Sequence, residues 1–399
     1  MGPCASVVRY SLAYLISSLF HLRLASLEMN SIWLLMMVTY SPALTLKTSL
    51  PASPLFATVT EALGKVPIVR LNRIHPTCKD HHLYLKLESC NPGGSIKEKN
   101  AAYLVNEAEK QGLLRSGGTI VESSSGNFGI GLAIVGATKG YRVMIVIDAK
   151  TPVTMRRMLT AYGAELLEVP LSEADSQGSM QVARMKKAQE LALNIPDAWY
   201  PCQHKNPSNT DAHELWTARE IEAAFGGAPD AIVIGVSTAG QLGGISRYFK
   251  RYHPQTRIIG VDVAGSAIFG TPRHPYKMTG LGLSFVPPNF DPQMLDAAYS
   301  VDDGLAFSVC HGLAKQEGML LGASTGAIVA AALADTQRFT TPQTMLLLNP
   351  DRGDRYLETV YNADWLTAQN INILQHSHLT AAIANLLPVP LDIVGRSQE

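Results

Sequence analysis

The sequence predicts an α/β protein with two domains, each built on a mostly parallel sheet that helices cover on both faces. Short apolar runs alternate with amphipathic segments from about residue 64 to residue 366, a pattern typical of strands joined by crossover helices. The chain has 399 residues, a length that suggests two domains. Its composition, 46% hydrophobic and 17% charged, supports a large core and argues against extensive disorder.

The elements follow one another in a regular order. Alternating residues predict a strand at 83–88, and apolar residues at i, i+3, i+4 and i+7 from Ala101 predict the helix after it. Further strands are expected at residues 118–122, 141–147, 165–169, 231–236, 257–263 and 344–349. Further helices are expected at residues 127–139, 152–162, 180–193, 210–225, 242–252, 304–316 and 325–334.

These elements divide the chain into four regions. Residues 56–205 are expected to form a smaller domain, and residues 206–370 a larger one, with residues 69–90 able to pair with the larger domain. Residues 371–399 form a weakly patterned tail. Residues 1–55 lie outside the core, and three interpretations stay open: an extension created by start-site choice, a targeting or membrane-associating segment, and an arm on a partner subunit.

Charge and cysteine content narrow the class of protein. Lys+Arg and Asp+Glu both number 33, so nothing favours a nucleic-acid partner. The five cysteines form no C-x-x-C pair, so neither a zinc site nor a disulfide framework is expected. The apolar runs at 11–24 and 32–38 are shorter than the roughly 18–20 residues that span a bilayer, so membrane association is not expected. A cytoplasmic enzyme with reduced thiols and no metal is the simplest interpretation.

Residues 91–97, which read Asn-Pro-Gly-Gly-Ser-Ile-Lys, connect the first strand to the first helix. Ser95 and Glu98 have the spacing of a capping box, which places Lys97 in the first helical turn. The positive end of the helix dipole disfavours the ammonium form there, and Schiff-base chemistry requires an easily deprotonated lysine. Lys97 is therefore a candidate catalytic residue, although a solvated lysine at a helix start has the same pattern.

Three polar loops follow apolar runs, where ligands of open α/β sheets bind. Residues 123–127 read Ser-Ser-Ser-Gly-Asn and present N–H groups at a helix start. Residues 237–244 read Ser-Thr-Ala-Gly-Gln-Leu-Gly-Gly and suit a phosphate, but they match neither the P-loop nor the dinucleotide fingerprint. Residues 322–327 place Ser324 at a helix start. Taken singly, each loop is also compatible with an ordinary capped turn or junction.

In combination, the lysine and the three loops resemble the fold-type II pyridoxal-phosphate (PLP) enzymes, the family of cysteine synthase, cystathionine β-synthase and the tryptophan synthase β chain. The resemblance implies two three-layer αβα domains with the active site between them, PLP as cofactor, small amino-acid substrates and a homodimer. It implies that Lys97 forms the Schiff base with PLP. Further cofactor contacts are implied for Asn127, Ser237, Thr238, Ala239, Gly240, Gln241 and Ser324. The substrate carboxylate is expected at Ser124, Ser125, Gly126 and Gln203.

The sequence departs from the common family pattern at two places. Residues 237–241 read Ser-Thr-Ala-Gly-Gln where Gly-Thr-Gly-Gly-Thr is usual, and Phe128 replaces a common threonine. Residues 84–88, 122–127, 268–270 and 351–361 are similar to the branch of N-(2-amino-2-carboxyethyl)-L-glutamate synthases. This branch implies β-replacement through an aminoacrylate, in which O-phospho-L-serine and L-glutamate yield a precursor of 2,3-diaminopropionate for siderophores.

Other functions stay open beside this one. A sulfur nucleophile, as in cysteine synthase or cystathionine β-synthase, is the main alternative. A dinucleotide-binding module would leave Lys97 unexplained, and a catalytically silent relative would not need both Lys97 and Asn127. Residues 351–355 are expected to border the ring-nitrogen side of the site. The charge of five residues makes them candidates for binding the leaving phosphate: Arg156, Arg157, Arg247, Lys277 and Arg352.

Overall fold

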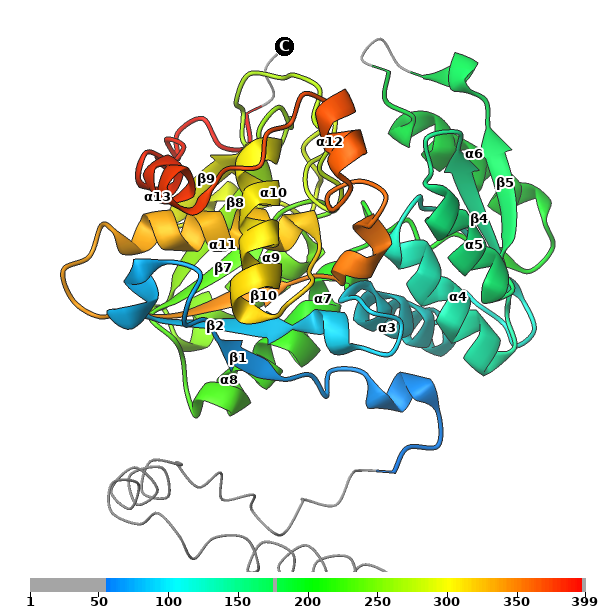
Figure 1. Ribbon diagram of the computed structural model, residues 1–399. Coiled ribbons are helices and arrows are strands. Elements are labelled where there is room, and N and C mark those ends of the chain that lie inside the picture. The colour runs from blue at the N-terminus through cyan, green and yellow to red at the C-terminus, as the bar shows by residue number, and fades with distance from the viewer. Residues whose placement is uncertain (1–54, 175–177, 397–399) are drawn as a thin grey trace, which may run out of the picture. The chain divides into compact units, whose positions relative to one another are not determined.

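The computed structural model describes residues 55–174 and 178–396, so the three interpretations of the N-terminal extension lie outside the described residues. From Phe56 onward the chain clusters as one unit. Two sheets organise it, and helices pack on both faces of each (Figure 1). In these two ranges no helix is long and apolar enough to cross a bilayer.

The larger sheet has six strands in the order β1-β2-β10-β7-β8-β9. Only the β1–β2 pair is antiparallel, and the other four pairs are parallel. The strands are β1 (Ile68–Arg70), β2 (His82–Leu87), β7 (Ala231–Gly235), β8 (Arg257–Val263), β9 (Ala297–Val301) and β10 (Thr344–Asn349). Strand β2, which precedes residues 91–97 (the lysine loop), therefore pairs with a strand from the far end of the chain.

Both faces of this sheet are buried because successive side chains alternate between two apolar clusters. Val233 belongs to the cluster with α10, α11 and α13, whereas Ile232 and Ile234 belong to the cluster with α8 and α9. The helices are α8 (Ala218–Phe225), α9 (Gly240–Tyr252), α10 (Asp303–Gly312), α11 (Ala323–Thr336), α12 (Ala363–Ala368) and α13 (His376–Ala384).

The smaller sheet has four parallel strands in the order β5-β4-β3-β6. Ile120 and Ile145 face α3, α4 and α5, whereas Val121 and Val146 face α6. The strands are β3 (Thr119–Ser123), β4 (Arg142–Asp148), β5 (Glu165–Val169) and β6 (Ala198–Trp199). The helices are α3 (Lys97–Lys110), α4 (Asn127–Lys139), α5 (Val153–Ala161) and α6 (Gln181–Asn194).

The predicted fold class, two three-layer αβα lobes with mostly parallel sheets, is confirmed. Two predicted helices are interrupted, because a π-helical turn at His213–Thr217 separates α7 (Ser208–Ala212) from α8, and another at Leu313–Glu317 follows α10. The sequence predicted no element in the tail, yet α13 lies there, and its Leu379 and Ile383 are buried in the larger lobe's core.

The motifs meet because their loops follow the carboxyl ends of strands. The lysine loop follows β2, and residues 124–127 (the Ser/Asn loop) follow β3. The loop at 237–241 follows β7, and residues 350–356 follow β10. This arrangement brings segments that are distant in sequence to one cleft between the two lobes.

Candidate active site

Lys97 lies in the first turn of α3, as the sequence predicted, but the N-cap residue is Ile96 and not Ser95. Half of the expected capping box is present: the Glu98 carboxylate accepts hydrogen bonds from the backbone N–H groups of Ser95 at 2.9 Å and Gly93 at 2.6 Å. The reciprocal half is missing, since the buried Ser95 hydroxyl has no hydrogen-bond partner among the described residues. Glu98 therefore holds the lysine loop against the start of α3.

The Lys97 amine has the properties of a nucleophile. Burial lowers its pKa to about 8, because desolvation disfavours the ammonium form. Over residues 55–174 and 178–396, no carboxylate or other side chain forms an ion pair or hydrogen bond with this amine. A substantial fraction of neutral amine is thus available near neutral pH.

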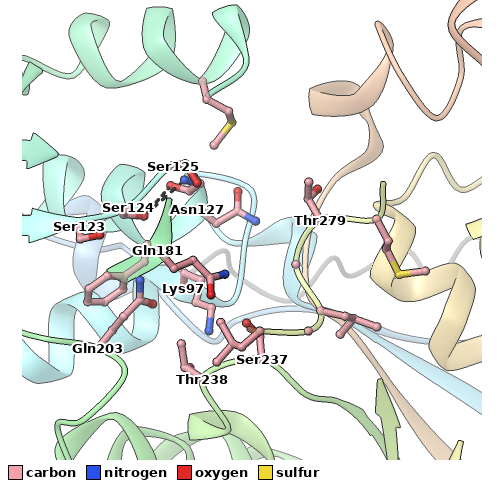
Figure 2. Close-up of a pocket in the computed structure, with 18 of the residues that line it drawn as sticks. Lys97, Ser123, Ser124, Ser125, Asn127, Gln181, Gln203, Ser237, Thr238 and Thr279 are labelled. Atoms are coloured by element: carbon pink, nitrogen blue, oxygen red, sulfur yellow. Dashed lines mark hydrogen bonds between the residues drawn. The ribbon is translucent and has the colours of Figure 1, made fainter. Parts of the chain in front are cut away.

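Two adjoining cavities surround Lys97. The larger, of about 380 Å³, is lined by Lys97 and by residues from both lobes, and the smaller has about 30 Å³. Figure 2 shows the Lys97 side chain ending in the space between the 124–127 loop and Ser237 and Thr238. Predicted residues that line the larger cavity are Ser124, Ser125, Gly126, Asn127, Gln203, Ser237 and Thr238. Those that line the smaller one are Asn127, Ser237, Thr238, Ala239, Gln241 and Ser324.

The Ser/Asn loop joins β3 to α4. The Ser124 hydroxyl accepts a hydrogen bond from Gly129 N–H at 3.0 Å, so it supports the first turn of α4. The Asn127 amide donates to Asp351 from the other lobe at 2.7 Å. Gln203 lies beside the loop, and its backbone N–H donates to the buried Glu122 carboxylate. The loop therefore keeps backbone donors near the cleft while its side chains fix its shape.

Residues 237–241 form the turn between β7 and α9, which we call the anion turn because its backbone would suit an anion. Ala239 has a left-handed backbone with φ 62°, which turns the chain into the helix. A Cβ at Gly240 would lie 2.3 Å from Asn209 Oδ1, so only glycine fits there. The first N–H groups of α9 have no intrahelical acceptor and suit a phosphate. Gly240 thus shapes the turn although it does not line either cavity.

Ser324 also lines the small cavity. It is the second residue of α11, is 2% exposed and shares the cavity with Asp351. As the sequence predicted, residues of the 351–355 stretch border the site, because Asp351 and Arg355 both line the cleft. The structure therefore brings the predicted lysine, amide, anion turn and serine into one place.

Comparison with known proteins agrees with this geometry. The family model described as pyridoxal-phosphate dependent enzyme matches residues 59–351. The chain belongs to this family. A curated relative, the N-(2-amino-2-carboxyethyl)-L-glutamate synthase of Cupriavidus metallidurans, is 36% identical over 77% of this chain and 90% of its own length. The cysteine synthase of Helicobacter pylori is 35% identical over 76% of this chain and 97% of its own length.

Solved structures lead to the same family. The crystal structure of O-ureido-L-serine synthase superposes with a TM-score of 0.71 and 34% identity, covering 79% of this chain and all of that one. This protein is accordingly a PLP-dependent enzyme of the cysteine synthase type, and its reaction class is β-replacement.

The described residues fit PLP. Half-buried Lys97 offers an amine of lowered pKa for the aldehyde. The start of α9 and Thr238 offer donors for the phosphate, and buried Ser324 offers a neutral partner for the ring nitrogen.

The cations of the cleft differ from those expected by charge. Arg156, Arg247 and Arg352 each pair with an acidic side chain, and none of the five candidates lines the larger cavity. The cations that do line it besides Lys97 are Lys150, Arg184 and Arg355. A sequence signal existed for Arg184, since it occupies the buried stripe of α6 between Met180 and Ala188, where an arginine is unusual.

Proposed function

We propose that this enzyme replaces the phosphate of O-phospho-L-serine with the amine of L-glutamate, giving N-(2-amino-2-carboxyethyl)-L-glutamate for 2,3-diaminopropionate and siderophore biosynthesis. The similarity to the Cupriavidus enzyme supports the products. The choice of a phosphorylated substrate rests on one observation, which is that Arg184 is buried beside the cleft with incomplete hydrogen bonding.

Arg184 is a buried cation whose hydrogen-bonding capacity is largely unused. It is 8% exposed, and its Nη1 lies 3.1 Å from Asp148 Oδ2. Its Nε and Nη1 have no hydrogen bond of good geometry to any described residue. A guanidinium offers parallel N–H groups that match a phosphate. A phosphorylated substrate would bring a dianion to the part of Arg184 that lines the cavity, whereas the uncharged ester group of O-acetylserine would bring no anion to it.

Lys150 adds a second positive charge to the same cavity. Its Nζ donates to the Gly178 carbonyl at 2.5 Å, and no acidic side chain of the described residues pairs with it. O-phosphoserine and glutamate together bring a phosphate and three carboxylates. The excess of cations in the cleft therefore suits this substrate pair better than O-acetylserine and sulfide.

Lys97, the 124–127 loop, Gln203 and Arg184 each have a role in this reaction. Bound PLP supplies an electron sink for the negative charge that develops at the substrate α-carbon. Lys97 holds the cofactor and, once freed by the substrate, takes the α-proton and later returns it. Backbone N–H groups of the 124–127 loop and Gln203 hold the substrate carboxylate. Arg184 stabilises the phosphate that leaves with the electron pair of the broken C–O bond. The glutamate nitrogen then bonds to the β-carbon, and the proton that its ammonium group gives up is balanced by release of the phosphate as hydrogen phosphate.

A sulfur nucleophile is the second candidate, because the Helicobacter cysteine synthase is nearly as similar as the Cupriavidus enzyme. From the family resemblance alone, we also propose a cytoplasmic homodimer.

The purified holoenzyme tests the substrates directly. O-phosphoserine or O-acetylserine is supplied with glutamate, sulfide or homocysteine in separate reactions, and the products are identified by mass. We expect turnover with O-phosphoserine and glutamate, and turnover with sulfide alone would contradict the proposal.

Arg184→Met then tests the observation itself. Loss of charged hydrogen bonds should lower kcat/KM for O-phosphoserine about 10- to 100-fold, with little change for any residual reaction of O-acetylserine. Arg157→Met is a matched control, because Arg157 is exposed on helix α5 and does not line the cleft. Equal losses for the two substrates would show that Arg184 does not recognise phosphate.

A further inference from the structure

The chain segment that follows β10 is attached to the lysine loop. Ile96 N–H donates to the Pro350 carbonyl at 2.8 Å, and Arg352 N–H donates to the Gly94 carbonyl at 3.2 Å. These bonds form a short antiparallel bridge between Ser95 and Asp351. The segment therefore has a fixed position beside Lys97 before its side chains are considered.

Two side chains of this segment hold the Asn127 amide at both ends. The Asn127 nitrogen donates to Asp351 Oδ2 at 2.7 Å, and Arg355 donates to the Asn127 oxygen. Arg355 also donates to the Gly93 carbonyl of the lysine loop, and the Tyr356 hydroxyl donates to Asp351 Oδ2. Asp351 is 2% exposed and Arg355 is 7% exposed, so water competes little for these bonds.

The chemistry of these partners fixes the direction of the amide. A guanidinium can only donate and a carboxylate can only accept. In the opposite orientation, the Asn127 nitrogen would face the Arg355 donors and its oxygen would face the Asp351 carboxylate. Both contacts would then be repulsive, so one orientation is strongly favoured. Since an amide nitrogen carries two hydrogens, one N–H of Asn127 stays available at the wall of the cavity that also contains Lys97.

We propose that Asp351 and Arg355 are positioning residues that hold the Asn127 amide in one orientation, so that its second N–H is a directed hydrogen-bond donor to the cofactor. The inference rests on the proposed placement of PLP beside Lys97 and Asn127, but not on the identity of the substrates. The 351–356 segment thus has a role of its own, which is to orient the Asn127 amide. Neither Lys97, the anion turn nor Ser324 has that role.

Asp351→Asn is the direct test in the holoenzyme. An asparagine can accept or donate, so the Asn127 amide can turn over and its directed N–H is lost. We expect the apparent Kd for PLP to rise roughly tenfold and the visible absorption maximum of the bound cofactor to shift. Arg355→Lys should act in the same direction, because an ammonium cannot bridge Asn127 and Gly93 as the planar guanidinium does.

Matched controls lie in the same segment. Arg352 and Asp354 form an exposed ion pair, so Asp354→Asn and Arg352→Lys should leave both the Kd and the absorption maximum unchanged. A merely structural role of Asp351 would lower the melting temperature without moving the absorption maximum, and that outcome would overturn the inference.

A double-mutant cycle shows whether Asp351 acts through Asn127. Asn127→Ala is measured alone and together with Asp351→Asn. We expect the double variant to match Asn127→Ala alone, whereas fully additive effects would contradict the inference. If Asp351→Asn does not fold, the cycle with Arg355→Lys decides.

Failure of this inference is distinct from failure of the proposed function. A wild-type enzyme whose visible absorption did not depend on Lys97 would refute the cofactor placement itself. Normal absorption in the wild type with an unchanged Asp351→Asn variant would refute only the positioning role.

Discussion

Replacing Glu88 with glutamine should destabilise the enzyme strongly, because this carboxylate neutralises two buried lysines. Lys99 Nζ lies 2.8 Å and Lys86 Nζ lies 3.0 Å from Glu88 Oε1. Both lysine side chains are at most 2% exposed and Glu88 is fully buried. Glu220, their other acidic partner, is 27% exposed. In Glu88→Gln, two buried cations would share one carboxylate.

The magnitude follows from the burial of this cluster, because removing one partner of a buried ion pair costs about 3–5 kcal/mol. Burial opposes ionisation of Glu88, but Lys99 and Lys86 outweigh it and hold the pKa of this carboxyl below its usual value of 4.5. Because the folded-state pKa is depressed, the contribution is fully present above pH 4.5 and is lost as the pH falls further below it.

Urea unfolding of wild type and Glu88→Gln at pH 7, followed by fluorescence and circular dichroism, measures the difference in free energy of unfolding. The difference should shrink as the pH falls below 4.5. Glu107→Gln is the control, since Glu107 pairs with the exposed Lys110, and it should cost less than about 0.5 kcal/mol. A loss below about 1 kcal/mol for Glu88→Gln would show that the two lysines do not need this charge.

Two further predictions concern the cofactor. The Lys97 pKa of about 8 implies that attachment of PLP to the apoenzyme slows as the pH falls below 8, by about tenfold per pH unit. Stopped-flow absorption measures this rate, and a rate that does not change between pH 6 and pH 8 would contradict the prediction. The Lys97→Ala variant should contain no cofactor that borohydride can reduce. Gly240→Ala places a Cβ 2.3 Å from Asn209 Oδ1, so the anion turn must shift and PLP affinity should fall at least tenfold by equilibrium dialysis. Ala239→Gly, where the left-handed backbone is retained, is the control and should bind PLP normally.

The sequence predicted the long buried strands well because their periodicity is local. Strands β8 and β10 have the expected bounds, and α4 begins and ends as expected at Asn127 and before Gly140. The shortest strands were missed: β1 has three residues and β6 has two, too few for any periodicity to develop. The five residues of β9 follow a long irregular stretch and become a strand through pairing with β8.

The site was predictable where a motif and a backbone feature coincide. Lys97 opens α3, and Gly240 stands where a Cβ is excluded. The cations were not predictable from charge, because the pairing of Arg156 with Glu168 and the burial of Arg184 depend on how α5 and α6 pack against the sheet. Likewise, Asp351 and Asn127 are 224 positions apart in the sequence, so no local sequence pattern could predict their contact.

The pairing of β2 with β10 also affects how the chain reaches its fold during synthesis. Ser89, just after β2, bonds to Asn349 at the end of β10, 260 positions later. When a ribosome has made the smaller sheet, β2 still lacks its parallel neighbour, and an unpaired apolar strand invites aggregation. Such long-range closure is slow. Nascent chains that pause before residue 344 should therefore depend on chaperones more than the finished enzyme does.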